Sequence, residues 1–279
     1  DAEHLKTAKK REALDEYTID AIEATKNADI VFICTPIESV VSMVKTIAST
    51  VKKGCIITDV GSSKLNIVSE VESSIPEGVI FIGGHPMAGS ERSGITAATK
   101  FLFEGTNYIL TPSGKTDKEA LESLRSFIER LDVKISILSP EKHDLAVAGI
   151  SHMPLFVAAS LVNTVNDADE CKEEMIRLAS SGFRDSTRIA SGNIQMGKDM
   201  FVTNKTAVLH MIDKFKRSLT LLEDIIKDGD AEKIAAELER AKKLMSELKG
   251  TTDSREISKT IKDSARTADV KEYGEEKLS

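Results

Sequence analysis

The sequence predicts an α/β domain built on a parallel sheet, followed by an all-α domain. In the first half, short apolar runs alternate with segments of helical spacing, which is typical of βαβ units. After residue 138 the strand pattern stops and only helical patterns follow. The chain has 279 residues, more than one average domain, so we predict two domains, 1–138 and 139–279.

The predicted strands are short, continuous apolar runs. Such runs indicate strands that are covered on both faces, as in a parallel sheet. They cover residues 30–34, 55–60, 79–82, 107–110 and 134–138. Helices are predicted between and before them, over residues 1–16, 21–26, 39–51, 65–74 and 117–131.

Polar loops follow the first three predicted strands, at residues 35–36, 59–64 and 85–94. Because ligands bind beyond the carboxyl ends of parallel strands, we expect all three loops to open on one crevice. The third loop is rich in Gly and Pro and contains His85, whose unperturbed pKa suits proton transfer near neutral pH. A Gly-rich turn with a surface histidine is the alternative for that loop alone.

Helical spacing organises the second half. Ser139 and Pro140 suit the N-cap and first position of a helix. His152 lies on the apolar face of that helix, and Pro154 removes a backbone amide and should kink the helix beside it. A core histidine bonded to a backbone group is the alternative for His152. Arg188, in a polar break, suits a carboxylate ligand, although a solvated or salt-bridged arginine fits equally.

Two long amphipathic stripes, over residues 204–227 and 231–249, predict a helical bundle that completes its core with a second subunit. A net charge of −7 argues against nucleic acid or an anionic membrane as a partner. The three cysteines are far apart and have no zinc-site spacing, so we expect no metal and a reducing compartment. No apolar run approaches about 18 residues and no signal-peptide pattern opens the chain, so we expect a cytoplasmic protein.

Four motifs, in order and in register, carry a resemblance to a known family. They are D-V-G-S-S-K at 59–64, G-G-H-P-M-A-G-S-E at 83–91, H-D-L-A-V-A-G-I-S-H-M-P at 143–154 and F-R-D-S-T-R-I-A at 183–190. Together they resemble the prephenate dehydrogenases, the TyrA family of tyrosine biosynthesis. The resemblance implies a Rossmann-like nucleotide-binding domain, a helical dimerisation domain, a homodimer, and NAD or NADP as cofactor. It also implies oxidative decarboxylation of prephenate to 4-hydroxyphenylpyruvate.

The resemblance also implies roles for individual residues. His85 matches the catalytic base, and Ser62 matches a residue that hydrogen-bonds both this histidine and the cofactor region. The residues expected to hold or surround the substrate are His152, Arg188, Ser90 and Glu91. The residues expected at the cofactor are Thr35, Pro36, Asp59 and Ser62.

The family's opening strand, G-x-G-x-x-G turn and helix are not found in this sequence, so we expect that an N-terminal segment is missing from it. An arogenate or cyclohexadienyl dehydrogenase is the nearest alternative. A β-hydroxyacid dehydrogenase shares the architecture but would present a catalytic lysine in its helical domain. From a different class, the chain fits a non-catalytic dimerisation remnant that binds aromatic ligands.

Overall fold

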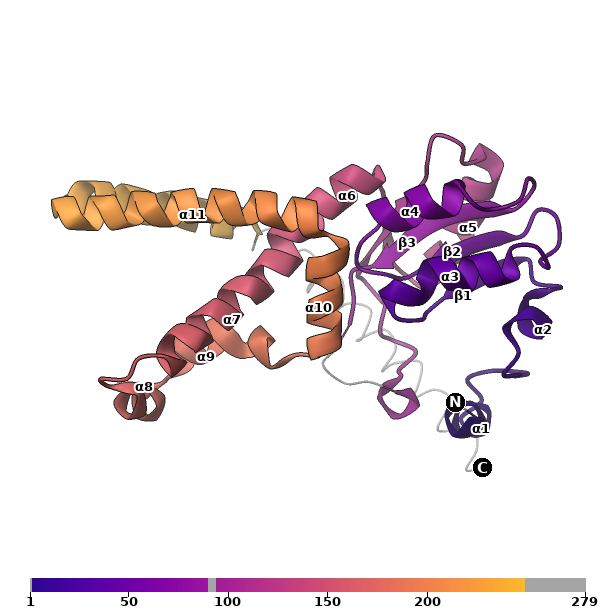
Figure 1. Cartoon of the computed structure of the whole chain (residues 1–279), viewed down its shortest axis with the longest axis horizontal. Helices are drawn as coiled ribbons and strands as arrows, with labels where there is room; N and C mark the ends of the chain where they lie inside the picture. The colour runs from indigo at the N-terminus through magenta and orange to yellow at the C-terminus, as the bar shows by residue number, and fades with distance from the viewer. Residues whose placement is uncertain (1, 90–93, 249–279) are drawn as a thin grey trace, which may run out of the picture. The chain divides into compact units, whose positions relative to one another are not determined.

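The computed structural model describes residues 2–89 and 94–248 (Figure 1). By its internal contacts the chain divides into two compact units, Asp1–Ile212 and Asp213–Ser279. The first unit contains the sheet together with the helices that follow it, up to the first turns of α11 (Lys205–Asp228). The predicted domain boundary after residue 138 stays a prediction.

A five-stranded sheet with the order β1-β2-β3-β4-β5 forms the centre of the first unit. Its strands are β1 (Ile30–Ile33), β2 (Ile56–Asp59), β3 (Ile80–Pro86), β4 (Asn107–Thr111) and β5 (Lys134–Ile137). β1, β2 and β3 are parallel, so the three predicted polar loops do leave the same edge of the sheet. The predicted fold class, a mainly parallel α/β sheet followed by helices, is confirmed.

The prediction of a wholly parallel sheet is wrong at β4, which runs antiparallel to β3 and parallel to β5. A parallel pair needs a crossover of a dozen or more residues, usually a helix. The described part of the connection between β3 and β4 contains only the 3₁₀ turn η1 (Ile95–Ala97) as regular structure. The chain therefore returns directly, and β4 reverses direction.

Helices cover both faces of the sheet, as the continuous apolar runs predicted (Figure 1). α3 (Ile37–Ile47) and α4 (Leu65–Glu72) bury their apolar sides in one core, and α5 (Lys118–Glu129) buries its apolar side in the other. Two further short helices, α1 (Ala2–Lys10) and α2 (Ala21–Thr25), precede β1.

The helices after the sheet begin where the sequence predicts. The Ser139 hydroxyl accepts a hydrogen bond from the Lys142 amide at 3.3 Å, which makes it the N-cap of α6. The elements that follow are α6 (Pro140–Val147), the π-helical turn η2 (Ala148–His152), α7 (Met153–Asn166), α8 (Lys172–Leu178), α9 (Ser181–Thr187), the 3₁₀ turn η3 (Arg188–Ser191) and α10 (Ile194–Thr203). The π-helical turn ends at His152, so the predicted irregularity beside Pro154 is confirmed.

The polar break predicted over residues 181–188 is instead mostly helical, because α9 occupies residues 181–187. Its last residue, Thr187, is buried and donates a hydrogen bond to the Phe183 carbonyl at 2.7 Å. Contacts between α9 and α7 stabilise this helix, which is too short for its periodicity to be visible in the sequence.

One helical run, Pro140–Asn166, is long and apolar enough to cross a membrane, with a mean hydropathy of 1.9 over its best window. The expectation that no apolar run approaches this length is therefore wrong. The run nevertheless carries His143, Asp144 and His152, which are fully or almost fully buried and hydrogen-bonded within the first unit. The core helix of a globular domain has these properties.

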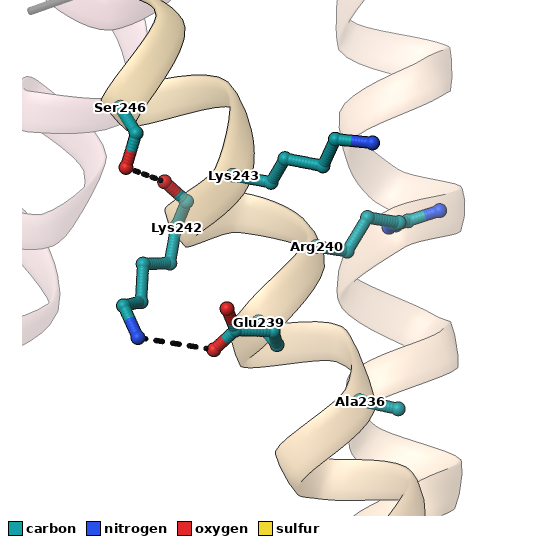
Figure 2. Close-up of a pocket in the computed structure, with 6 residues that line it drawn as sticks. All are labelled: Ala236, Glu239, Arg240, Lys242, Lys243 and Ser246. Carbon is teal, nitrogen blue, oxygen red and sulfur yellow. Dashed lines mark hydrogen bonds and ion pairs between the residues drawn. The ribbon is translucent and has the colours of Figure 1, made fainter.

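The second unit contains the rest of α11 and a helix over residues 231–248. Gly229, with φ +66°, ends α11, and the Asp230 carboxylate accepts the Lys233 amide at the start of the next helix. Figure 2 shows one face of that helix, where Lys242 pairs with Glu239 at 3.2 Å. This face is a row of solvated charges, and its side chains do not converge on a common point.

Candidate active site

Asp59 and Lys64 form a buried ion pair at the carboxyl end of β2, and both side chains are fully buried. The other Asp59 partners are backbone amides, Gly61 at 2.9 Å and Gly84 at 3.2 Å. Burial lowers the pKa of Lys64, and the charge of Asp59 opposes that shift. Because both oxygens of Asp59 are bonded inside the protein, its carboxylate cannot contact a cofactor, and that expectation is wrong for its side chain.

β3 carries His85 into the same edge of the sheet. The residue before it, Gly84, is packed so closely that a Cβ there would lie 2.6 Å from the Asp59 carbonyl oxygen. Only glycine fits this position without a shift of the strands. His85 therefore sits on a strand whose place is fixed by tight backbone packing, and its side chain is 9% exposed.

A chain of hydrogen bonds leads from His85 into α6. Nδ1 of His85 lies 2.8 Å from Nε2 of His143, and Nδ1 of His143 lies 2.8 Å from a carboxylate oxygen of Asp144. That carboxylate also accepts the backbone amides of Lys64 at 2.7 Å and Leu65 at 3.0 Å, at the start of α4. Asp144 thus joins the first helical segment after the sheet to the loop after β2.

A second chain of hydrogen bonds reaches His152. The side-chain nitrogen of Asn204 donates to the carbonyl oxygen of Asp144 at 2.8 Å and lies 3.2 Å from Nδ1 of His152. The opposite ring nitrogen, Nε2 of His152, is buried and has no hydrogen-bond partner among the described residues. We refer to the five residues His85, His143, Asp144, His152 and Asn204 as the histidine network.

Burial is the main influence on the two histidines that the sequence singled out. It lowers the pKa of His85 to about 2, and positive charge on His143, Lys64 and His152 adds to the shift. It lowers the pKa of His152 to about 4, a shift that Asp144 opposes and His143 adds to. Both rings are therefore neutral at pH 7, so each carries one proton and one lone pair.

Sequence reasoning did not find the roles of three members of the network. His143 and Asp144 open one of the four motifs, but nothing local shows which residues they contact. A charged residue next to a histidine at the start of an apolar helix is a usable signal, because buried ionisable groups are paired or functional. Asn204 gives no such signal, since its partners lie 52 and 60 residues away.

The other expected residues lie around this edge or elsewhere. Ser62 is half-buried in the loop after β2, and in the described part of the chain it forms no hydrogen bond with His85, whose Nδ1 is bonded to His143. Thr35 follows β1, and its buried hydroxyl has no partner among the described residues, while Pro36 immediately precedes α3. Arg188 is exposed at the start of η3 and is not a member of the histidine network.

Ser90 and Glu91 lie outside the described residues. The expectation of no metal is not tested by a structure without ions. Among the described residues, no cluster of His, Cys, Asp and Glu has the arrangement of a metal site.

Comparison with known proteins identifies the family. Residues 1–137 match the family described as prephenate dehydrogenase, nucleotide-binding domain, and residues 139–240 match prephenate dehydrogenase, dimerization domain. The chain belongs to the prephenate dehydrogenase family. Relatives include the prephenate dehydrogenases of Bacillus subtilis, 38% identical over 86% of this chain and 65% of the relative, and Lactococcus lactis, 33% identical over 88% and 68%. The chain thus spans slightly less than two thirds of the Bacillus protein's length.

Solved structures of family members have the same fold. A prephenate dehydrogenase from A. aeolicus, in complex with hydroxyphenyl propionate and NAD+, is 30% identical, with a TM-score of 0.83 over 89% of this chain and 86% of that one. Synechocystis arogenate dehydrogenase is 34% identical, with a TM-score of 0.77 over 86% of each chain. Prephenate dehydrogenases therefore have relatives with two named substrates at similar distance from this chain.

Proposed function

We propose that this protein is a prephenate dehydrogenase, which converts prephenate to 4-hydroxyphenylpyruvate with NAD or NADP in tyrosine biosynthesis. The observation that carries the proposal is His85. Its ring is neutral and largely buried, and it lies at the ligand-binding edge of the sheet with Nε2 unbonded among the described residues. A histidine of this kind suits a general base, and the family matched over both parts of the chain specifies the reaction.

In the proposed reaction, Nε2 of His85 accepts the proton of the substrate's 4-hydroxyl group. The hydride from C4 passes to the bound nicotinamide, and the ring carboxylate leaves as carbon dioxide, so that the product ring is aromatic. Aromatisation supplies the driving force, and the protein chiefly orients the hydroxyl, the hydride and the carboxylate. His152 offers a buried, unpaired ring nitrogen to the substrate, and Arg188 offers a guanidinium group to a substrate carboxylate.

The remaining site residues are part of the same proposal. Ser90 and Glu91 follow His85 in the chain and are proposed to line the substrate pocket. Thr35, Pro36 and Ser62 are proposed to contact the cofactor, because they lie in loops at the carboxyl edge of β1 and β2. The unpaired, buried hydroxyl of Thr35 fits a polar group of such a ligand.

We also propose a cytoplasmic homodimer. The part of the chain that matches a dimerization domain carries large apolar side chains at its surface, and two of them, Leu178 and Ile194, are 72% and 89% exposed. A second copy of the chain would cover such residues. Sedimentation of the purified protein should give twice the mass of one chain, and a monomer at micromolar concentration would contradict this part of the proposal.

The function is tested by absorbance at the reduced-nicotinamide band, with prephenate or arogenate as substrate and NAD or NADP as cofactor, in all four combinations. We expect signal with prephenate and at least one cofactor. Signal with arogenate alone would replace the substrate but keep the reaction class. No signal in any combination, with nicotinamide fluorescence unchanged by the protein, would support the non-catalytic remnant and contradict the proposal.

A further inference from the structure

We propose that His143, Asp144 and Asn204 are positioning residues that hold His85 and His152 in opposite tautomers. In this arrangement His85 presents a bare Nε2 to the site, whereas His152 presents an Nε2–H. The inference rests on the proposed function for its catalytic meaning. The tautomers themselves follow from hydrogen bonds of the histidine network and can be measured without any turnover.

The tautomer of His85 follows from the direction of three bonds. The Asp144 carboxylate accepts two backbone amides, so it also accepts from Nδ1–H of His143 at 2.8 Å. A neutral His143 with its proton on Nδ1 has a lone pair on Nε2. Nδ1 of His85, 2.8 Å from that lone pair, must therefore be the donor. The one proton of the His85 ring is thus on Nδ1, and Nε2 is bare.

The tautomer of His152 follows from Asn204 in the same way. The carbonyl oxygen of Asp144 can only accept, so the amide group of Asn204 must face it with its nitrogen, at 2.8 Å. The second proton on that nitrogen points to Nδ1 of His152 at 3.2 Å, which is therefore an acceptor. The proton of the neutral His152 ring is on Nε2, the buried atom without a partner among the described residues.

Opposite tautomers suit two different tasks at one site. A bare Nε2 on His85 can take the proton of a hydroxyl group, with the O–H bond broken and an N–H bond formed. The positive charge that appears on His85 is then stabilised through His143 by the Asp144 carboxylate. The Nε2–H of His152 is a donor that needs an oxygen acceptor, which a substrate carboxylate, carbonyl or ether oxygen supplies. Asp144 controls both rings, one through its side chain and one through its backbone.

The experiment is long-range ¹H–¹⁵N correlation NMR on the whole chain labelled in its histidines, at pH 7.5. We expect His85 to show the Nδ1–H pattern and His152 the Nε2–H pattern. Each signal is assigned by the loss that follows His85→Asn or His152→Asn, and His210→Asn at an exposed position is the matched control. A proton on Nε2 of His85, or on Nδ1 of His152, would overturn the inference, whether or not the chain has dehydrogenase activity.

Two pairs of variants test the positioning role beyond a structural one. At position 143, Gln keeps an acceptor for His85 and a donor for Asp144, whereas Leu keeps neither. We expect His143→Leu to lower kcat roughly tenfold or more with little change in KM, and His143→Gln to restore most of it. Asn204→Asp replaces a donor by an acceptor, so we expect His152 to switch to Nδ1–H and KM to rise roughly tenfold, while Asn204→Gln, which keeps the donor, loses less. Equal kcat in the two position 143 variants would contradict the role of His143.

Discussion

Gly84→Ala is the substitution whose cost the structure defines most closely. The added Cβ would lie 2.6 Å from the Asp59 carbonyl oxygen and 2.9 Å from the Thr58 hydroxyl oxygen. The carbonyl belongs to the backbone of β2 and cannot rotate away as a flexible side chain could, so β2 and β3 must separate. The Gly84 amide also donates to the Asp59 carboxylate at 3.2 Å, and the same shift would lengthen this bond.

Overpacking of a closely packed interior costs about 1–3 kcal/mol, and a lost hydrogen bond to a charged group costs about 1.5–3 kcal/mol. We therefore expect Gly84→Ala to lower the free energy of unfolding by about 3 kcal/mol. At about 2–4 °C per kcal/mol for a domain of this size, the melting temperature should fall by roughly 6–12 °C. Because His85 is the next residue, we also expect activity to fall below the melting temperature.

The assay is thermal unfolding followed by circular dichroism, with Gly114→Ala as the matched control. A Cβ at Gly114 meets nothing within 4 Å, and its φ is not positive, so the same substitution there should be neutral or slightly stabilising. Equal melting temperatures for the two variants would refute the close approach of β2 and β3 at His85.

Three further predictions concern the buried charges. Lys64→Met should cost about 3–5 kcal/mol because it leaves the Asp59 carboxylate buried without its cation, and the double variant with Asp59→Asn should cost less; urea unfolding of both tests this. Asp144→Asn should cost about 1–3 kcal/mol and lower kcat, since an amide cannot accept all the bonds of that carboxylate; urea unfolding and initial rates would show it, and unchanged values would count against its place in the network. The folded-state pKa values of His85 and His152 lie below the unfolded value of about 6.5, so the unfolded chain binds more protons as pH falls. Stability should be complete above pH 6.5 and decrease by about 1.4 kcal/mol per pH unit for each ring as pH falls towards 4, and a flat urea midpoint between pH 7 and 5 would contradict it.

The parts of the fold that could be predicted from the sequence depend on local patterns. Continuous apolar runs located the strands, and the Ser139 and Pro140 pair located the start of α6. The direction of β4 was predicted wrongly because it depends on the connection before it, where length alone does not distinguish a crossover from a direct return. The helix α9 was missed because seven residues are too few to show a period.

The site could be predicted only where one residue carries the chemistry by itself. His85 and His152 were found from a Gly-rich loop and from a polar residue on an apolar helix face. Their partners were not found, because the bond from His143 joins residues 58 apart and the bond from Asn204 joins residues 52 apart. Asp59 was assigned to the wrong role, since only the structure shows that its partners are internal.

The measurement that tests the central claim most directly is the rate of nicotinamide reduction by His85→Asn at saturating prephenate. Asn is close in shape to part of the imidazole ring but cannot accept the hydroxyl proton as a base. The account predicts a fall in kcat of about 10²- to 10⁴-fold, with an unchanged melting curve and with His210→Asn, at an exposed position, as active as the original chain. A folded His85→Asn variant that reduces the cofactor at the original rate would contradict the assignment of His85 as the base.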